Sequence, residues 1–339
     1  MSKPLRVAIV GATGAVGEEM LRVMERRNFP VASIRLLASA RSAGRTLAFR
    51  GEELEVKALT VDSFSCIDVV FFSAGATISK EFVPVAVNSG AVVVDNSSAF
   101  RLTENVPLVV PEINGDDVAG HRGIISNPNC TTAVALMGLA PLHRAFGLKR
   151  VFASSYQAVS GAGARAIEEL RIQTRECLQN KKVDPEVFAH QIAFNVIPHI
   201  DSFVENGYTK EEMKMQNEAR RILHLPGFHA SVTCVRVPVF RAHSVAVSAE
   251  FERPIDVRSA REAIDAFPGV QVVDDPDARQ YPMPIDCAGQ DDCFVGRIRR
   301  DCAFENGLAM WVCGDQLLRG AALNAVLIAE KAFGIQPQS

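Results

Sequence analysis

The first third of the chain alternates short apolar runs with stretches of helical periodicity. The apolar runs occupy residues 7–10, 33–38, 68–73 and 91–95, and the helical spacing occupies 18–27 and 80–88. Continuous apolar runs are typical of parallel strands that are buried on both faces, and right-handed crossover helices connect such strands. The pattern predicts an α/β fold that begins with a Rossmann-like, doubly wound parallel sheet.

The pattern changes after residue 130. Helical periodicity covers 131–142, 162–179, 258–266 and 320–333, and strand-like runs cover 150–158, 231–237, 245–251 and 308–313. Since 231–237 and 245–251 both alternate, we expect them to form an antiparallel pair. We predict a first domain over 1–129 that is completed by a C-terminal helix over 318–339. The second domain, over 130–317, is predicted to be α+β with a mostly antiparallel sheet.

Composition narrows the class of protein. The 339 residues include 36 Lys and Arg against 39 Asp and Glu, with 48% apolar and 22% charged residues. That length suggests two domains, and a net charge of -3 argues against general nucleic-acid binding. No apolar run reaches the 18 residues of a membrane span, and the first residues lack the pattern of a secretory signal. The eight cysteines form no C-x-x-C pair, so we expect reduced thiols in a cytoplasmic protein.

A glycine-rich segment follows the first predicted strand and opens the first helix. It consists of Gly11, Ala12, Thr13, Gly14, Ala15, Val16 and Gly17. Small residues there let the backbone approach a pyrophosphate, and the helix N-terminus supplies N–H donors. The alternative is a strand-to-helix turn that needs glycine only for steric reasons. Its place in an alternating pattern favours a dinucleotide site.

The end of the second predicted strand bears on the identity of the dinucleotide. An NAD site usually has an acidic residue there for the ribose hydroxyls, but residues 37–45 contain none. Arg41, with the hydroxyls of Ser39 and Ser42, suits a 2′-phosphate, although Arg41 could instead be an ordinary surface side chain. We therefore predict NADP in preference to NAD.

One thiol stands where a thiol becomes reactive. Cys130 lies between a predicted strand at 123–126 and a helix, so the helix N-terminus is expected to favour its thiolate. The alternative for any cysteine is a small buried side chain, and we assign that role to the other seven. His243, between two predicted strands, is the best candidate for a partner base, although a lone histidine is often structural. The histidines lack zinc-ligand spacing, so no metal is predicted.

These segments together resemble the bacterial aspartate-4-semialdehyde dehydrogenase family. The resemblance runs through the whole chain in eight motifs, which are GATGAVG (11–17), SARSAGR (39–45), DNSSAFR (95–101), NPNCTT (127–132), YQAVSGAG (156–163), EEMKMQNE (211–218), RVPVFRAH (236–243) and GAALNAVLIAEK (320–331). No one motif is decisive, but the combination is specific.

The resemblance implies an enzyme that reduces L-4-aspartyl phosphate with NADPH. The products are L-aspartate 4-semialdehyde, phosphate and NADP+, on the route to lysine, diaminopimelate, threonine and methionine. Cys130 would form a thioester, with His243 as general acid and base. Asn129 and Gln157 would orient the acyl group. The remaining substrate contacts implied are Arg236 to the carboxylate, Glu211 to the ammonium, and Arg101 with Lys214 to the phosphate. Taken alone, Glu211 and Lys214 could be a simple helix ion pair.

The resemblance also adds cofactor residues and a homodimer. The added residues are Ser73, Gly75, Ser97, Ser160, Gly161 and Gln316. The family commonly has Asp-Asn-Leu where this chain has Asp315-Gln316-Leu317, and the longer amide puts the cofactor contact of Gln316 in doubt. The nearest alternative, N-acetyl-glutamyl-phosphate reductase, would not need Glu211, because its substrate has a blocked amine. Glyceraldehyde-phosphate dehydrogenase fits the motifs less well, and a non-catalytic NADP-binding protein would leave Cys130 unreactive.

Overall fold

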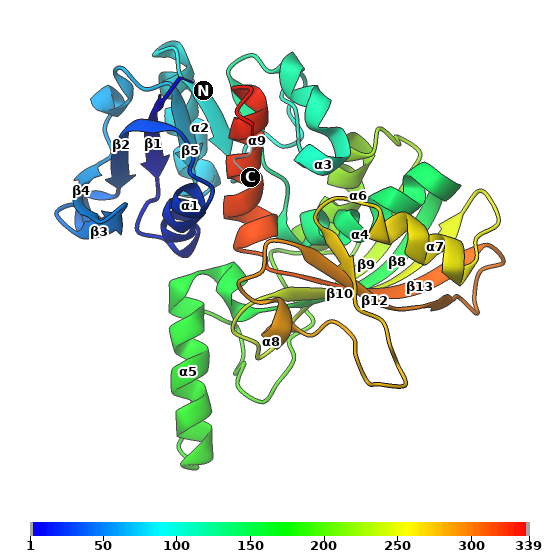
Figure 1. Cartoon of the computed structure of the whole chain (residues 1–339). Helices are drawn as coiled ribbons and strands as arrows, with labels where there is room; N and C mark the ends of the chain where they lie inside the picture. Colours follow the sequence, from blue (N-terminus) through cyan, green and yellow to red (C-terminus); the bar gives the residue numbers. More distant parts are fainter. Residues whose placement is uncertain (1–2, 337–339) are drawn as a thin grey trace. The chain divides into compact units, whose positions relative to one another are not determined.

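A computed structural model describes residues 3–336 (Figure 1). The chain folds into two compact units. The first contains the chain up to Asn129 and the segment from Ala321 onward, and the second contains Cys130–Gly320. In the described part of the chain, no helix is both long enough and apolar enough to cross a membrane.

The first unit is built on a sheet of seven strands. They are β1 (Leu5–Val10), β2 (Val31–Ala38), β3 (Thr46–Phe49), β4 (Glu52–Ala58), β5 (Val69–Phe72), β6 (Val92–Asp95) and β7 (Ile124–Ser126). The strand order is β3-β4-β2-β1-β5-β6-β7, and every pairing is parallel except that of β3 with β4. The predicted Rossmann-like α/β fold is confirmed. The β3–β4 hairpin was not predicted, because β4 has the mostly polar sequence EELEVKA.

Helices pack against this sheet. The first two, α1 (Ala15–Arg26) and α2 (Ala76–Asn88), connect parallel strands, and a short helix, α3 (Pro111–Asn114), precedes β7. The last helix, α9 (Leu323–Ala332), follows a π-helical turn over Leu318–Ala322. It lies against β6, α1 and α3, and Glu330 forms an ion pair of 2.7 Å with Arg27. The helix is shorter than the predicted 318–339, of which residues 337–339 lie outside the described part of the chain.

The second unit has a mixed sheet of six strands. They are β8 (Leu148–Gln157), β9 (His229–Arg236), β10 (His243–Phe251), β11 (Val270–Val272), β12 (Cys293–Arg300) and β13 (Gly307–Gly314), in the order β11-β12-β13-β10-β8-β9. The helices are α4 (Cys130–Phe146), α5 (Ala164–Leu178), α6 (Lys210–Ile222), α7 (Val257–Asp265) and α8 (Pro284–Cys287). Helix α4 packs against β8, β10, β12 and β13, so the strand side chains that face it are buried.

The predicted antiparallel pairing of 231–237 with 245–251 is wrong. Strand β8 lies between them, since β9 pairs with it in parallel and β10 pairs with it antiparallel. The physical reason is the connection 237–242, which is too long for a two-residue turn and contains Pro238. It passes over the end of β8, where the main-chain N–H of Val237 donates to the carbonyl of Gln157. We call residues 237–242 the crossover.

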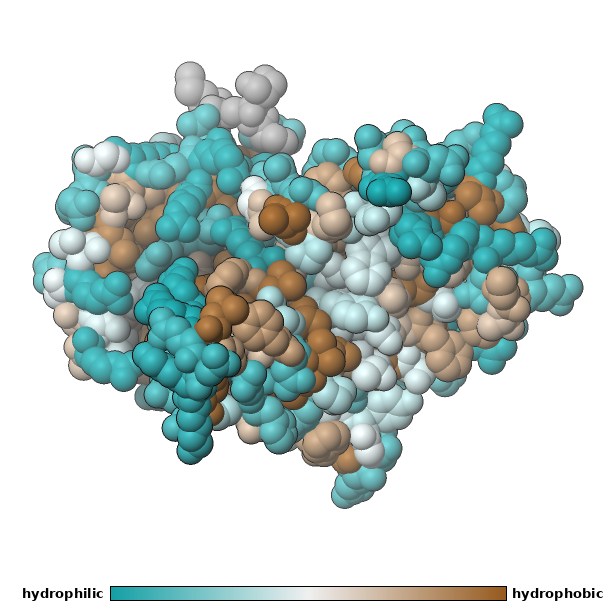
Figure 2. Space-filling model, turned by 90° about the horizontal axis from the view of Figure 1, so that it is seen from below, coloured by the Kyte–Doolittle hydropathy of each residue, from teal (hydrophilic) through white to brown (hydrophobic). Residues whose placement is uncertain are grey.

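Helix α5 extends away from the sheet of its unit (Figure 1). Its inner face packs on a small cluster that includes Val159, Leu170 and Ile192. Leu178 at its end and Phe194 in the following segment are 73% and 68% exposed. Figure 2, which views the molecule from the side toward which α5 extends, shows hydrophobic side chains at the surface among hydrophilic ones.

Candidate active site

The crossover brings three predicted site residues to one end of the second sheet. Gln157 ends β8, Arg236 ends β9 and His243 begins β10. All three are buried, with exposed fractions of 2%, 6% and 0%. Because side chains alternate along a strand, Gln157 and Ser155 lie on the buried side of β8. The placement therefore follows from strand register and from the path of the chain over β8.

Cys130 is the first residue of α4. Its Sγ lies 3.6 Å from Nε2 of His243, within reach of a hydrogen bond to sulfur. The position at a helix N-terminus favours a thiolate, because the helix dipole and the N–H groups of the first turn stabilise negative charge. Cys234 on β9 offers a contrast, since burial raises the pKa of its thiol to about 12. Only one of these two thiols thus lies in a setting that favours ionisation.

The ring of His243 is held on both sides. Its Nδ1 lies 3.1 Å from the main-chain nitrogen of Ala158, which donates to it. Burial, with a further contribution from the Arg236 charge, holds the pKa of His243 well below its usual value. Gly161 lies so close that a Cβ there would stand 3.2 Å from Cε1 and Nε2 of the ring. The imidazole is therefore neutral and tightly packed.

Arg236 is a buried cation, and not all of its N–H donors are used by the protein. Its Nη1 donates to the carbonyl of Ala158 at 2.7 Å, and its guanidinium lies 5.7 Å from the centre of the Phe188 ring. Within residues 3–336, no carboxylate forms an ion pair with Arg236, and its Nε has no hydrogen-bond partner. Burial lowers its pKa. A buried guanidinium of this kind is suited to an incoming carboxylate.

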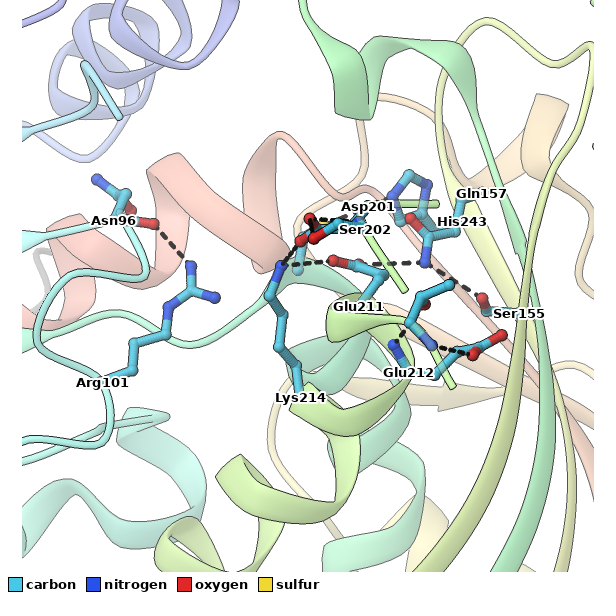
Figure 3. Close-up of polar contacts among 12 residues, drawn as sticks. Asn96, Arg101, Ser155, Gln157, Asp201, Ser202, Glu211, Glu212, Lys214 and His243 are labelled. Atoms are coloured by element: carbon cyan, nitrogen blue, oxygen red, sulfur yellow. Dashed lines mark hydrogen bonds and ion pairs between the residues drawn. The ribbon is translucent and has the colours of Figure 1, made fainter. Parts of the chain in front are cut away.

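Helix α6 contributes a carboxylate and an ammonium. Glu211 Oε1 accepts from Gln157 Nε2 at 3.3 Å, and its Oε2 accepts from Lys214 Nζ at 2.8 Å. Lys214 Nζ also donates to Asp201 at 3.0 Å, and these contacts are drawn in Figure 3. Lys214 is therefore shared by two carboxylates. The sequence reasoning missed Asp201, because a loop residue thirteen positions away leaves no local signal of this contact.

The start of α6 is fixed by its own capping residues. The Thr209 side chain accepts from the main-chain N–H of Glu212, and the Glu212 side chain accepts from the N–H of Thr209. Glu212 Oε1 also accepts from the N–H of Cys234 on β9 at 3.0 Å. The buried Glu212 thus joins the first turn of α6 to the sheet, and that turn carries Glu211.

In the first unit, the glycine-rich loop has the geometry of a phosphate cradle. Gly11 has φ 87°, and a Cβ there would stand 2.4 Å from the carbonyl oxygen of Ser73. The carbonyl of Leu37, near the end of β2, accepts from the N–H groups of Gly11 and Ala12. Helix α1 begins at Ala15 without a side-chain cap, and α2, which follows Gly75, also lacks one. N–H groups at the start of α1 are thus presented to a ligand anion. Thr13, Gly14, Val16 and Gly17 belong to the same loop and first turn.

A short 3-10 turn over Ala40–Ser42 follows β2. It carries Arg41 and Ser42, and Ser39 precedes it. Arg41 and Ser39 are exposed, and Ser42 is half-buried. Because the end of β2 is hydrogen-bonded to the glycine-rich loop, this turn lies beside the loop within the first unit. The exposed Arg41 side chain is therefore available beside the loop in which a dinucleotide would bind.

A polar loop follows β6 in the same unit. Buried Arg101 donates from Nε to the carbonyl of Asn127 at 2.9 Å and from Nη2 to that of Asn96 at 2.7 Å; the link to Asn96 appears in Figure 3. The Ser97 hydroxyl donates to Asp95 at 2.8 Å, and burial raises the pKa of Asp95. The loop is thereby held rigidly. Asn129, also buried, ends this part of the unit.

Gln316 and Ser160 are bonded to each other in the second unit. Gln316 Nε2 donates to the Ser160 hydroxyl, and its Oε1 accepts from the N–H of Ala242 at 2.8 Å. Ala242 has φ 71°, a strained value for alanine, and directly precedes His243. The amide of Gln316 therefore braces the backbone beside His243. Among residues 3–336, no group of three His, Cys, Asp or Glu side chains is arranged to hold a metal ion.

Comparison with known proteins agrees with this arrangement. Residues 6–121 match the family model of the semialdehyde dehydrogenase NAD binding domain, and residues 139–319 match that of the semialdehyde dehydrogenase dimerisation domain. The chain is 53% identical to an aspartate-semialdehyde dehydrogenase of Aquifex aeolicus, over 96% of this chain and 97% of the relative.

Solved structures agree as well. The structure of aspartate semialdehyde dehydrogenase II from Vibrio cholerae complexed with ASA has a TM-score of 0.95 at 43% identity, over 97% of this chain and 98% of that one. The Candida albicans aspartate semialdehyde dehydrogenase with NADP has a TM-score of 0.76 at 25% identity, over 98% and 100%. The chain is an enzyme that belongs to the aspartate-semialdehyde dehydrogenase family.

Proposed function

We propose that the enzyme catalyses the reversible reaction of L-4-aspartyl phosphate, NADPH and a proton to L-aspartate 4-semialdehyde, phosphate and NADP+. The observation that carries the proposal is the Cys130–His243 pair at the start of α4, combined with the buried Arg236, whose Nε lacks a protein partner in the described structure. A nucleophile beside a carboxylate-binding guanidinium suits a small amino-acid substrate. The reaction would serve lysine, diaminopimelate, threonine and methionine biosynthesis in the cytoplasm.

The cofactor proposed is NADP. The glycine-rich loop and the N-terminus of α1 would hold its pyrophosphate, and Arg41 with Ser39 and Ser42 would hold the 2′-phosphate. The remaining contacts proposed from the family resemblance are Ser73, Gly75, Ser97, Ser160, Gly161 and Gln316. When bound, NADPH supplies the hydride that reduces the acyl carbon. The NADP named with the Candida albicans relative is consistent with this choice.

The substrate groups have partners of matching charge. Arg236 would bind the α-carboxylate, and Glu211 would accept from the α-ammonium. Arg101 and Lys214 would bind the phosphate, as the family resemblance implies. A free amine is what distinguishes aspartyl phosphate from the substrate of N-acetyl-glutamyl-phosphate reductase. The buried carboxylate of Glu211 therefore favours the aspartyl compound.

The chemistry needs a thiolate and a place for negative charge. The Cys130 thiolate attacks the acyl carbon, and the C–O bond to phosphate breaks with both electrons leaving on the phosphate oxygen. The product is a thioester on Cys130, oriented by Asn129 and Gln157. After reduction at the acyl carbon, the oxyanion re-forms its C=O bond while the C–S bond breaks, which regenerates the thiolate. His243, at 3.6 Å from the sulfur, lies beside these charges.

We also propose a homodimer that uses the face of the second sheet opposite α4. On that face, Phe152 and Tyr156 are 50% and 36% exposed. Phe152 stacks on Phe304, and Tyr156 packs against Trp311, with ring centres 5.7 and 5.2 Å apart. An aromatic sheet face is suited to burial against a second copy. Size-exclusion chromatography with light scattering should give twice the monomer mass, and a monomer would refute the proposal.

The activity is tested in the reverse direction. Aspartate semialdehyde, phosphate and NADP+ should give NADPH absorbance at 340 nm that depends on phosphate. Cys130→Ser should lose nearly all turnover and still bind NADP+ as measured by calorimetry. Folded, cofactor-binding protein without phosphate-dependent turnover would overturn the proposal and favour a non-catalytic NADP-binding protein. Turnover that survives in Cys130→Ser would place the nucleophile elsewhere.

A further inference from the structure

We infer that Asp201, in the loop before α6, is a positioning residue that keeps the charged amine of Lys214 in place for a phosphate group. The Asp201 carboxylate remains the counter-ion of Lys214 when Glu211 turns to the ammonium group of the substrate. The inference rests on the proposed function for the roles of Glu211 and Lys214. Asp201 acts through Lys214 and is assigned no contact with the substrate itself.

The amine of Lys214 has three N–H donors, and carboxylates use two of them. Nζ donates to Oε2 of Glu211 at 2.8 Å and to Oδ2 of Asp201 at 3.0 Å (Figure 3). The third donor has no acceptor within residues 3–336 and is left for an incoming anion. The Lys214 side chain is 23% exposed, so a small anion can reach it from solvent. The two carboxylates thus set the direction of the third N–H.

Glu211 is not a lasting partner for Lys214. It is buried, and its Oε1 already accepts from Gln157 Nε2 at 3.3 Å. In the proposed reaction it also receives the α-ammonium group, which competes with Lys214 for the same two oxygens. A largely buried ammonium group is unfavourable without a counter-ion. A second carboxylate outside this competition therefore keeps Lys214 charged when the substrate is bound.

The charges in this cluster support one another. Burial alone would lower the pKa of Lys214, but Glu211 and Asp201 more than offset burial, and the pKa is raised. Burial alone would raise the pKa of Asp201, but the N–H of Ser202 and the Lys214 ammonium lower it, with a smaller contribution from Lys210. Lys214 and Asp201 are therefore both ionised at neutral pH. When Glu211 turns to a substrate, Asp201 is the anion that still acts on Lys214.

The loop that carries Asp201 is fixed at both ends to elements that carry site residues. At one end, Ile197 and Arg236 of β9 exchange two main-chain hydrogen bonds of 2.9 and 2.8 Å. At the other end, the N–H of Lys210 in α6 donates to the carbonyl of Ser202 at 2.9 Å. Asp201 has φ 69°, which aspartate tolerates better than most residues, and its Oδ1 accepts from the N–H of Ser202 at 2.8 Å. The backbone thus determines where the carboxylate lies.

Asp201→Asn tests the inference, because it removes the charge and little else. Asparagine has the same shape, tolerates a positive φ equally well, and can still accept from the N–H of Ser202. In the reverse assay, the KM for phosphate should rise about 10-fold, the scale of coupling within one ion-pair network. The KM for aspartate semialdehyde and kcat should change less than about twofold. An unchanged or lowered KM for phosphate would overturn the inference, and so would equal rises in both KM values.

Two further variants separate an effect through Lys214 from a general effect of charge. Glu205 belongs to the same segment, is exposed and forms no ion pair in the described part of the chain. Glu205→Gln should therefore leave both KM values unchanged. In a Lys214→Met background, Asp201→Asn should not weaken phosphate binding any further. A loss of the same size there would mean that Asp201 acts independently of Lys214, which would overturn the positioning role.

The pH profile gives a readout that a purely structural role would not change. The charged groups that act on Lys214 are Glu211 on its own helix and Asp201 on the loop, and Gln157 of β8 contributes no charge. Because Asp201 raises the pKa of Lys214, Asp201→Asn lowers it, and phosphate binding is lost as the pH rises through that pKa. The alkaline decline of kcat/KM for phosphate should therefore begin about one pH unit lower in the variant. The same decline in both proteins would contradict the inference.

Calorimetric titration with inorganic phosphate in the presence of NADP+ separates this inference from the proposed function. A protein without turnover that binds phosphate, and binds it about 10-fold more weakly as Asp201→Asn, would overturn the proposed reaction and leave the role of Asp201 intact. Normal turnover with equal phosphate affinity in the two proteins would do the reverse. A folded protein that binds no phosphate would overturn both.

Discussion

Arg236→Met should make the protein more stable and at the same time sharply reduce its catalytic efficiency. Arg236 is 6% exposed, and burial lowers its pKa although the charges of Cys130 and Glu211 partly compensate the cation. A buried charge without a direct ion pair costs several kcal/mol, even after partial compensation by hydrogen bonds and by more distant charges. Methionine has a similar length, no charge and a flexible apolar chain that suits a core. The substitution therefore removes the cost of the charge and keeps the volume filled.

The contacts of Arg236 set the size of the effect. Met leaves the buried carbonyl of Ala158 without its donor at 2.7 Å, which costs about 1–3 kcal/mol. It also removes the cation from above the Phe188 ring, a loss of about 0.5–2 kcal/mol. Against several kcal/mol of charge burial, the net gain in unfolding free energy is about 1–2 kcal/mol. That gain corresponds to a rise in Tm of roughly 3–6 °C.

Calorimetry and steady-state kinetics together test the prediction. Removing one partner of a buried charge pair with the substrate costs about 2–5 kcal/mol, or roughly 30- to 5,000-fold in kcat/KM. Arg236→Lys is the matched control, because it keeps the buried charge and should gain no stability. A Met variant that unfolds at a lower temperature than the unmodified enzyme would refute the reasoning and make Arg236 a structural residue.

Three other predictions concern different parts of the chain. Arg41→Ala should weaken NADP+ binding by about 10-fold or more and leave NAD+ binding nearly unchanged, as measured by calorimetry; equal losses would exclude Arg41 from the 2′-phosphate site. Glu212→Gln keeps the shape of the side chain but replaces one carboxylate oxygen, which accepts from a buried main-chain N–H, by an NH2 group. The unfolding free energy should therefore fall by about 1–3 kcal/mol; an unchanged Tm would show that the Glu212 cap of α6 does not contribute to stability. The hydrogen bond from Arg6 lowers the pKa of Asp68 to about 2. The stabilisation by this hydrogen bond is present above pH 4 and is lost as the pH falls toward 2. In urea unfolding, the unfolding free energy of Asp68→Asn should therefore fall less steeply between pH 4 and pH 2 than that of the unmodified enzyme. An equal fall in both proteins would contradict this.

The sequence was most informative where local pattern decides structure. The buried runs that became β1 and β5 have 0% exposed residues at most positions, and their continuous apolar character predicts parallel strands. The glycine-rich turn was predictable because Gly11 needs a positive φ and close contact with the Ser73 carbonyl. Helix α4 begins at Cys130, as the strand–turn–helix pattern indicated.

The sequence was least informative where a role depends on distant partners. The pairing of β9 with β8 depends on the path of the crossover, which no local periodicity records. Helix α6 has few apolar residues, so its pattern gave little indication of its position. Asp201 and Ala158 acquire their roles only from Lys214 and His243, far along the chain. A backbone N–H in particular leaves no trace in the residue type.

The position of α9 has a consequence for how the protein is made. Strands β1 to β7 end at Ser126, but the helix that packs on β6, α1 and α3 begins at Leu323. At typical synthesis rates of about 5–20 residues per second, roughly 10–40 s pass between these points on the ribosome. The first unit, which is translated first, is therefore completed last, because it needs α9. During that interval the surface that later receives α9, including Arg27, is not yet covered by that helix.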